Sequence, residues 1–132
     1  MIDRDALVEA AKKAREAAYA PYSRFKVGAA VLCEDGSVYT GCNVENASYG
    51  VTSCAEPVAL FKAISDGKRK FQAIAIVLDS AEPAAPCGAC RQAIYEFGSE
   101  IEIIMANVDG KVESMSISEL LPRAFGPRSL QS

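Results

Sequence analysis

The sequence contains no histidine, although five of its 132 residues are cysteine. Histidine is the most common metal ligand and the side chain whose ordinary pKa lies closest to neutral pH. Any transition-metal site in this protein must therefore be built from Cys with Asp or Glu. A general base that works near neutral pH must be a carboxylate with a shifted pKa or a hydroxide bound to a metal.

Long runs of basic or apolar residues are also absent. The longest basic run is Lys68-Arg69-Lys70, and 14 Lys and Arg against 17 Asp and Glu leave a formal net charge of -3. Because nucleic-acid-binding proteins normally carry a basic patch that neutralises phosphates, no nucleic-acid partner is expected. No window approaches the roughly 18 apolar residues of a membrane span. The N-terminus also lacks a signal-peptide pattern, so we expect a cytoplasmic protein without membrane contact.

The length of the chain predicts a single domain over residues 1–132, because half of the residues are hydrophobic and one core of ordinary size can form. In a reducing compartment, cysteines more often bind metals or take part in catalysis than form disulfide bonds. The five cysteines therefore indicate a metal or catalytic site.

Hydrophobic periodicity and turn residues predict alternating helices and strands. Helices are expected over residues 3–20, 54–65 and 88–97, with a last helical turn begun by a capping box at Ser116 and Glu119. Strands are expected over residues 25–33, 37–44, 72–79 and 100–106, with a fifth after the turn at Asp109-Gly110. The order predicts an α/β fold: a three-layer α/β/α sandwich around a mixed five-stranded sheet.

Two short segments contain potential metal ligands, Cys54-Ala55-Glu56 and Pro86-Cys87-Gly88-Ala89-Cys90. Each lies where a loop is expected to turn into a helix. Unpaired N–H groups at a helix N-terminus favour thiolate over thiol, which is the form that binds metals. Three cysteines then supply three ligands. Structural zinc is generally closed by four protein ligands, whereas catalytic zinc keeps a fourth position open for water.

These segments also fit other kinds of site. A Cys-x-x-Cys pair also occurs in redox proteins and in structural zinc sites. Cys33 and Cys42 could supply a fourth ligand, but both lie in predicted strands, where Cys commonly acts as a small apolar residue. Glu56 could be a helix-terminal carboxylate favoured by the dipole. Beside a metal, however, it could move protons between bound water and a substrate.

A Cys followed two residues later by Glu, together with Pro-Cys-x-x-Cys, is the signature of zinc nucleobase deaminases. The sequence closely resembles the homotetrameric cytidine deaminase family over nearly its whole length. The matching segments are Tyr22-Ser23, Phe25 to Ala30, Gly41 to Asn46, Cys54 to Glu56, Pro86 to Gln92 and Glu119 to Pro122.

The resemblance implies hydrolytic deamination of free cytidine and deoxycytidine to uridine and deoxyuridine, with release of ammonia, in pyrimidine salvage. It implies one Zn²⁺ per subunit held by Cys54, Cys87 and Cys90, and no organic cofactor. Zinc-bound hydroxide would attack C4 of cytosine while the catalytic Glu56 shuttles protons.

The resemblance also implies substrate contacts. Asn43 and Glu45 would bind the ribose, and the negative charge of Glu45 would favour nucleosides over nucleotides. Phe25 would pack near the pyrimidine, and the backbone N–H of Ala55 would hold the pyrimidine carbonyl. Phe125 would stack on the base in a neighbouring subunit's site, which implies a homotetramer with shared active sites. Without the resemblance, Asn43 and Glu45 would be interpreted as polar residues at the edge of a loop. Phe25 would be interpreted as a core aromatic of a strand, and Phe125 as a tail residue packed on the surface.

The sequence departs from the family at Pro57, since the family commonly has Arg directly after the catalytic Glu. Three thiolates around Zn²⁺ carry an excess of negative charge, which weakens the metal as a Lewis acid. Arg91, directly after Cys90, is then the cation predicted to offset it. Proline itself fits the first helical turn, where no intrahelical N–H bond is lost.

Three rival functions fit the sequence less well than this one. A nucleic-acid deaminase should bring a basic groove and aromatic platforms, which this sequence lacks. A deaminase of a nucleoside antibiotic such as blasticidin S is disfavoured by the ribose pair Asn43 and Glu45. A non-enzymatic zinc-stabilised domain would be marked by a four-sulfur metal site.

Overall fold

The computed structural model describes residues 3–130 of the chain, and the secondary structure follows the predicted order. The elements are α1 (Arg4–Arg15), β1 (Val27–Cys33), β2 (Val38–Cys42), α2 (Ala55–Ser65), β3 (Phe71–Leu78), α3 (Gly88–Tyr95), β4 (Glu102–Asn107), β5 (Val112–Ser116) and α4 (Ile117–Leu120). Two short 3-10 helices, η1 (Tyr49–Val51) and η2 (Pro127–Leu130), complete the set. In the part of the chain that the structure describes, the helices are too short or too polar to cross a membrane.

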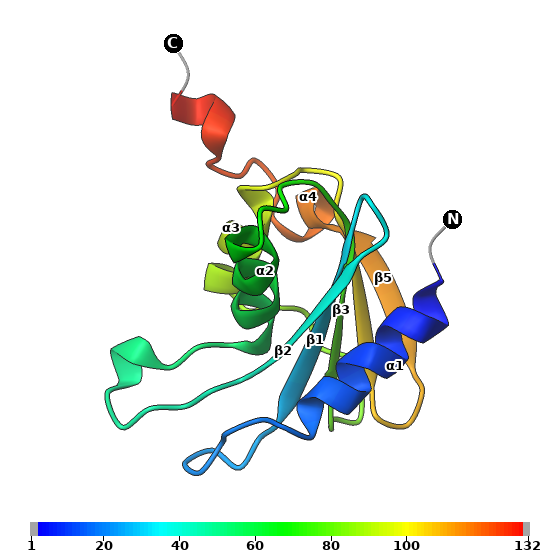
Figure 1. Cartoon of the computed structure of the whole chain (residues 1–132), viewed down its shortest axis with the longest axis vertical. Coiled ribbons are helices and arrows are strands. Elements are labelled where there is room, and N and C mark those ends of the chain that lie inside the picture. Colours follow the sequence, from blue (N-terminus) through cyan, green and yellow to red (C-terminus); the bar gives the residue numbers. More distant parts are fainter. Residues whose placement is uncertain (1–2, 131–132) are drawn as a thin grey trace.

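The five strands form one mixed sheet in the order β2-β1-β3-β4-β5. Strands β3 and β4 run parallel, and the other neighbouring pairs run antiparallel. Helix α1 covers one face of the sheet, and α2 and α3 cover the other (Figure 1). The predicted three-layer sandwich is therefore confirmed, with the apolar run of β3 at its centre.

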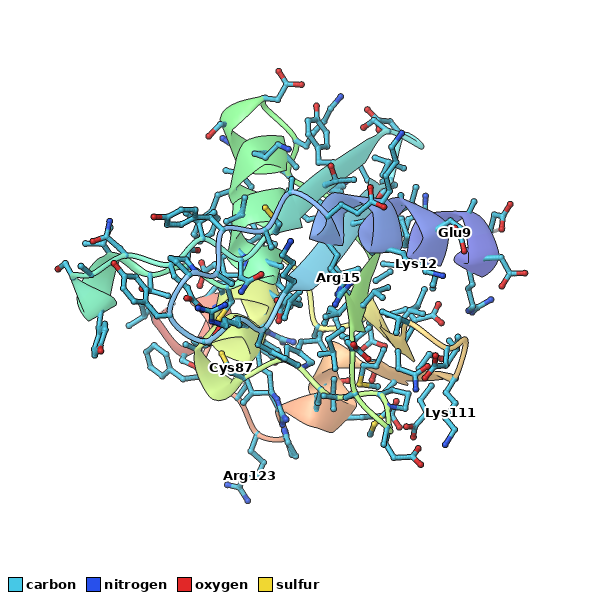
Figure 2. All side chains as sticks on the ribbon, turned by 90° about the horizontal axis from the view of Figure 1, so that it is seen from below. Glu9, Lys12, Arg15, Cys87, Lys111 and Arg123 are labelled. Carbon is cyan, nitrogen blue, oxygen red and sulfur yellow. The ribbon has the colours of Figure 1, made fainter. Side chains whose placement is uncertain are left out.

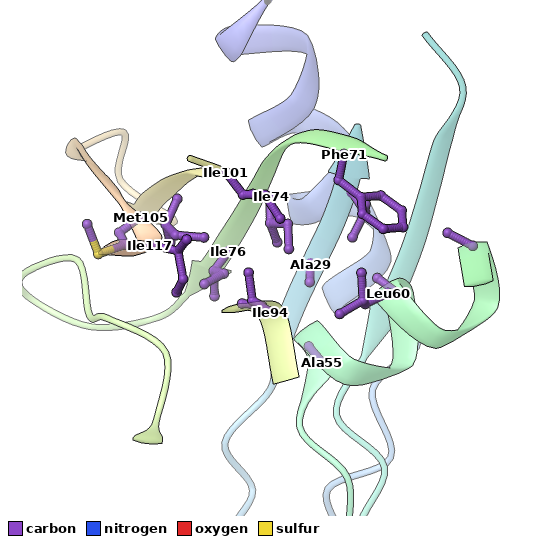
Figure 3. Close-up of a cluster of buried hydrophobic side chains, with 14 of the residues drawn as sticks. Ala29, Ala55, Leu60, Phe71, Ile74, Ile76, Ile94, Ile101, Met105 and Ile117 are labelled. Carbon is purple, nitrogen blue, oxygen red and sulfur yellow. The ribbon is translucent and has the colours of Figure 1, made fainter. Parts of the chain in front are cut away.

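The larger core lies between the sheet and helices α2, α3 and α4 (Figure 3). It contains large side chains that are almost completely removed from water, among them Leu60, Ile74, Ile76, Ile94, Ile103 and Ile117. The core on the α1 side is smaller and consists mainly of alanines from the central strands, with Leu7 and Ala11 of the helix. The two faces of the sheet therefore carry cores of different size.

Two glycines allow helix backbones to approach the sheet closely. A Cβ atom on Gly28 would lie 2.0 Å from the carbonyl oxygen of Ala11 in α1. A Cβ atom on Gly41 would lie 2.5 Å from the backbone nitrogen of Ala59 in α2. Since backbone atoms cannot move away as a flexible side chain can, both positions require the absence of a side chain.

The first helix ends five residues earlier than predicted, at Arg15 rather than Ala20. The next backbone N–H groups bond to carbonyls three residues back, which tightens the last turn. Tyr19 then forms a parallel bridge with Val44, and its N–H donates to the carbonyl of Asn43 over 3.0 Å. This pairing replaces the helical hydrogen bonds that the periodicity predicts. The predicted strand over residues 37–44 likewise ends at Cys42.

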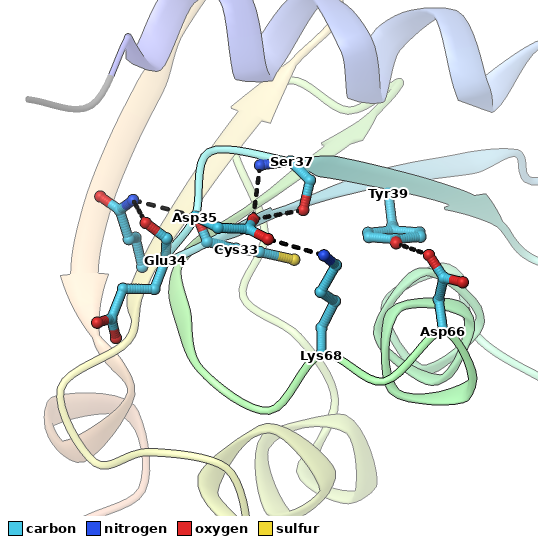
Figure 4. A network of polar contacts seen from close by, with 8 residues as sticks. Cys33, Glu34, Asp35, Ser37, Tyr39, Asp66 and Lys68 are labelled. Atoms are coloured by element: carbon cyan, nitrogen blue, oxygen red, sulfur yellow. Dashed lines mark hydrogen bonds and ion pairs between the residues drawn. The ribbon is translucent and has the colours of Figure 1, made fainter.

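A polar network ties the β1–β2 turn to the C-terminal end of α2 (Figure 4). Lys68 pairs with Asp35 over 2.7 Å, and the hydroxyl of Tyr39 donates to Asp66. The Lys68 ammonium and the Ser37 hydroxyl hold the pKa of Asp35 well below its ordinary value. The network lies at the end of α2 away from Cys54.

Candidate active site

Three thiols meet where α2 and α3 begin. Cys54 is the N-cap residue of α2, Cys87 is the N-cap residue of α3, and Cys90 lies one turn into α3; Figure 2 shows Cys87 at the start of α3. The three Sγ atoms lie within 4.8 Å of one another, with 3.9 Å between Cys54 and Cys87 and 3.2 Å between Cys87 and Cys90. Zn–S bonds of about 2.3 Å in a tetrahedron place sulfur atoms roughly 3.8 Å apart. The cluster therefore fits a zinc ion.

The cluster has three members within residues 3–130, not four. Cys33 is buried at the end of β1, and Cys42 lies in β2, as predicted for both. All five cysteines are free. A three-thiol site leaves one tetrahedral position for a further ligand, which is the arrangement of catalytic rather than structural zinc.

The thiols influence each other's protonation. Hydrogen bonding from the Cys90 thiol lowers the pKa of Cys54 to about 6, and the same interaction raises the pKa of Cys90. The predicted lowering at Cys54 is thus present, but its largest cause is the neighbouring thiol and not the helix N-terminus. A thiolate already favoured at Cys54 is suited to bind a metal cation.

Glu56 is the second residue of α2, and its side chain is only 4% exposed. Burial raises the pKa of Glu56, and the nearby charge of Cys54 raises it further. A carboxyl group whose pKa is moved toward neutral pH can take up and release a proton at low cost. Glu56 therefore combines proximity to the thiols with the acid–base character of a proton shuttle.

A cavity of about 380 Å³ opens in front of the two helix N-termini. It is lined by most of the site residues that the sequence predicts, namely Phe25, Asn43, Glu45, Cys54, Ala55, Glu56 and Cys87. Cys90 is buried behind them at 2% exposure. The cavity brings apolar walls, several polar residues and two of the thiols to one place, as in small-molecule sites.

The apolar wall of the cavity includes residues that sequence analysis does not single out. Val27 of β1 and Leu78 of β3 are neighbours in the sheet register, and Ile76 lies beside them. Their only sequence signal is an apolar residue in a strand, which is equally typical of the core. The polar rim contains Thr52 and Ser53 from the loop before α2.

Asn43 and Glu45 both line the cavity. The Asn43 side chain accepts a hydrogen bond from the Val27 N–H over 2.8 Å and donates one to the Phe25 carbonyl over 2.7 Å. It thereby fixes the backbone that carries Phe25. The amide nitrogen has a second N–H with which it can meet a ligand.

Glu45 is held as an ionised acceptor. Its carboxylate accepts hydrogen bonds from the backbone N–H groups of Tyr22 and Ser23 and from the Ser23 hydroxyl. The Ser23 hydroxyl is the largest cause of a lowered pKa at Glu45, and the two N–H groups add to it. Ser23 thus holds Glu45 in the cavity, although sequence analysis assigns Ser23 no role.

Pro57 lies in the first turn of α2, and the helix continues regularly from Ala55 through it, as predicted. Arg91 directs its guanidinium to two backbone carbonyls, those of Pro86 and Leu120, each at 2.7 Å. These bonds tie the loop before Cys87 to α4. The predicted balancing of thiolate charge by Arg91 stays a prediction.

Phe125 lies outside this cavity. It belongs to the segment after α4, which extends away from the body of the molecule (Figure 1), and its side chain is 59% exposed. Arg123 of the same segment projects outward in Figure 2. Phe125 is thus not among the residues that line the cavity of its own chain.

Comparison with known proteins places the chain among zinc-binding deaminases. Residues 1–106 match the family model described as "Cytidine and deoxycytidylate deaminase zinc-binding region". The chain is 50% identical to a cytidine deaminase of Sporosarcina psychrophila over 98% of this chain and 96% of that protein. It is 53% identical to one of Halalkalibacterium halodurans, covering 94% and 95% of the two chains. A crystal structure of a cytidine deaminase from Burkholderia pseudomallei superposes with a TM-score of 0.91 at 54% identity, covering 94% of this chain and all of that one.

Proposed function

This chain belongs to the cytidine deaminase family, and we infer from that membership and from the site that it hydrolyses cytidine to uridine and ammonia. One observation carries the inference: Cys54 and Cys87 of the three-thiol cluster and the buried carboxyl of Glu56 line the same cavity. We extend the inference to deoxycytidine as a second substrate, in pyrimidine salvage.

The three thiols hold one Zn²⁺ per chain, since their spacing and chemistry fit this ion. When bound, the zinc supplies Lewis-acid activation of a water molecule. No other cofactor is needed for a hydrolysis.

The proton transfers belong to Glu56 in our proposal. Its carboxylate takes a proton from the attacking water and delivers it to N3 of cytosine as C4 is attacked. It then carries the second proton of that water to the exocyclic amine, which leaves as ammonia. The burial and the raised pKa of Glu56 support this role.

The cavity walls orient the nucleoside. The backbone N–H of Ala55, in the first helical turn and thus without a partner within the helix, binds the pyrimidine carbonyl. Phe25 and the apolar wall contact the ring, while Asn43 and Glu45 bind the ribose hydroxyls. The negative charge of Glu45 favours free nucleosides over nucleotides.

The assembly is a homotetramer with shared active sites in our proposal. Two projecting segments support it, since each carries large apolar side chains in water: Tyr49 is 83% exposed, Phe125 is 59% exposed and Leu130 is 78% exposed. Exposed apolar groups of this kind are typical of protein interfaces. Phe125 then reaches the base in a neighbouring subunit. The free cysteines support a cytoplasmic, reducing location.

The loss of cytidine ultraviolet absorbance with purified protein tests this function. We expect turnover with the zinc-loaded protein, loss of turnover after chelation, and its return when zinc is added back. Absence of turnover in a protein shown by metal analysis to hold zinc would contradict the proposal.

A further inference from the structure

Helix α3 fastens the C-terminal segment at three points. Arg91 donates to the carbonyl of Leu120, the residue at the end of α4, over 2.7 Å. Gln92 donates through Nε2 to the carbonyl of Phe125 over 2.7 Å. The third point is the contact between the Tyr95 ring and Gly126. The last two contacts lie directly at Phe125 and at the residue that follows it.

The Tyr95 ring leaves no room for a side chain at Gly126. Gly126 is buried and its φ is not positive, so its backbone conformation is open to any residue. A Cβ atom at this position would lie 2.7 Å from Cε1 and 3.0 Å from Cδ1 of the Tyr95 ring. A side chain at this position would therefore force the Tyr95 ring or the segment to move, and would disturb the contact between them.

The backbone around Phe125 is thus held while its ring remains in water. The Gly126 N–H also donates to the Ser129 hydroxyl over 3.2 Å, and the Ser129 N–H donates back to the Gly126 carbonyl over 2.9 Å. An aromatic side chain on an unanchored tail would lose conformational entropy whenever it bound. Anchoring before binding removes much of that cost, which is the benefit of preorganisation.

We propose that Gln92 and Gly126 are positioning residues, which hold Phe125 in the orientation that stacks on the base in a neighbouring subunit's site. This inference rests on the shared active site proposed above. The side chain of Gln92 is exposed and lies outside the cavity of its own chain. Its effect on the reaction therefore runs through the C-terminal segment.

The variants Gln92→Ala and Gly126→Ala test the inference beside Phe125→Ala. A matched control is Glu96→Ala, an exposed residue further along the same helical segment. Base–aromatic stacking measured by alanine substitution corresponds to roughly a five- to hundredfold change in binding. We expect Phe125→Ala to raise KM within that range, and Gln92→Ala and Gly126→Ala to raise it several-fold. The control should leave KM unchanged, and kcat, zinc content and sedimentation should stay close to those of the parent in all four.

A double-mutant cycle separates positioning from a merely structural role. If Gln92 acts through Phe125, then Gln92→Ala should have no further effect on KM in a Phe125→Ala protein. If the fold-changes in KM of Gln92→Ala and Phe125→Ala multiply in the double variant, the inference is overturned. It is also overturned if Phe125→Ala raises KM while Gln92→Ala and Gly126→Ala leave it unchanged. An unchanged KM for Phe125→Ala itself would overturn the shared site and this inference together.

Discussion

Three of the five cysteines lie together in a cluster that fits zinc, and the other two do not belong to it. Single substitutions should therefore differ in their effect on zinc content. Cys54→Ser, Cys87→Ser and Cys90→Ser should each lose most of the bound zinc, because a hydroxyl is a poor zinc ligand and two thiolates remain. Cys42→Ser, in strand β2, is the matched control and should keep one zinc per chain. Metal analysis of the purified variants decides the question. Full zinc in any of the three would remove that cysteine from the ligand set.

The carboxyl of Glu56 should be needed for turnover and not for binding. Glu56→Gln keeps the shape and polarity of the side chain but cannot accept a proton. We expect kcat to fall by on the order of 10²- to 10⁴-fold or more, while zinc content and the inhibition constant of uridine stay close to those of the parent. Glu100→Gln, at an exposed position, serves as the control. Near-normal turnover in Glu56→Gln would show that another group moves the protons.

The hydroxyl of Ser23 should determine the pH below which the affinity for the nucleoside falls. It lowers the pKa of Glu45, so the charged acceptor persists to lower pH than an ordinary Glu. In Ser23→Ala the pKa of Glu45 should rise, and the affinity for the product uridine should begin to fall at a higher pH as the solution is acidified. Ser23→Thr retains the hydroxyl and should resemble the parent. Inhibition constants measured across the acidic range check this; identical profiles for the parent and Ser23→Ala would contradict it.

At the scale of helices and strands, the close approach of α2 to β2 should make Gly41 intolerant of a side chain. A Cβ atom there would lie 2.5 Å from the backbone nitrogen of Ala59 and 2.8 Å from the carbonyl oxygen of Ala55. We expect Gly41→Ala to lower the free energy of unfolding by about 1–3 kcal/mol or more. Gly50→Ala, where a Cβ atom meets nothing within 4 Å, is the control. Thermal melting of the zinc-loaded proteins measures both, and equal melting temperatures would contradict the expectation.

Local sequence patterns predict most helices and strands. Where an observed end differs from the predicted one, pairing with a distant part of the chain explains the difference. The capping box of Ser116 and Glu119 is found as predicted, because both of its hydrogen bonds join residues three apart. The early end of α1 could not be predicted, since it depends on Tyr19 pairing with Val44, far along the chain. The same contrast holds in the site. Cys87 and Cys90 stand out through their spacing, whereas Gln92 resembles any polar residue on a helix surface.

At the scale of the whole molecule, a shared site can be tested by mixing two inactive or weakened subunits. Tetramers formed from Glu56→Gln and Phe125→Ala chains contain sites in which an intact Glu56 meets an intact Phe125 from a neighbour. Co-expressed chains with two different tags should therefore regain a low KM that Phe125→Ala alone lacks. If each Phe125 served its own chain, mixing would restore nothing. Sedimentation of the parent as a fully active monomer would equally contradict the shared site.

Helix α3 has only eight residues, yet it serves the metal cluster and the C-terminal segment together. With about 3.6 residues per turn, inserting or deleting one residue rotates everything beyond it by roughly 100°. Such a change between Cys90 and Gln92 would leave the thiols in phase with one another and turn the anchors of Phe125 away from it. A change of length within this helix should therefore not be tolerated.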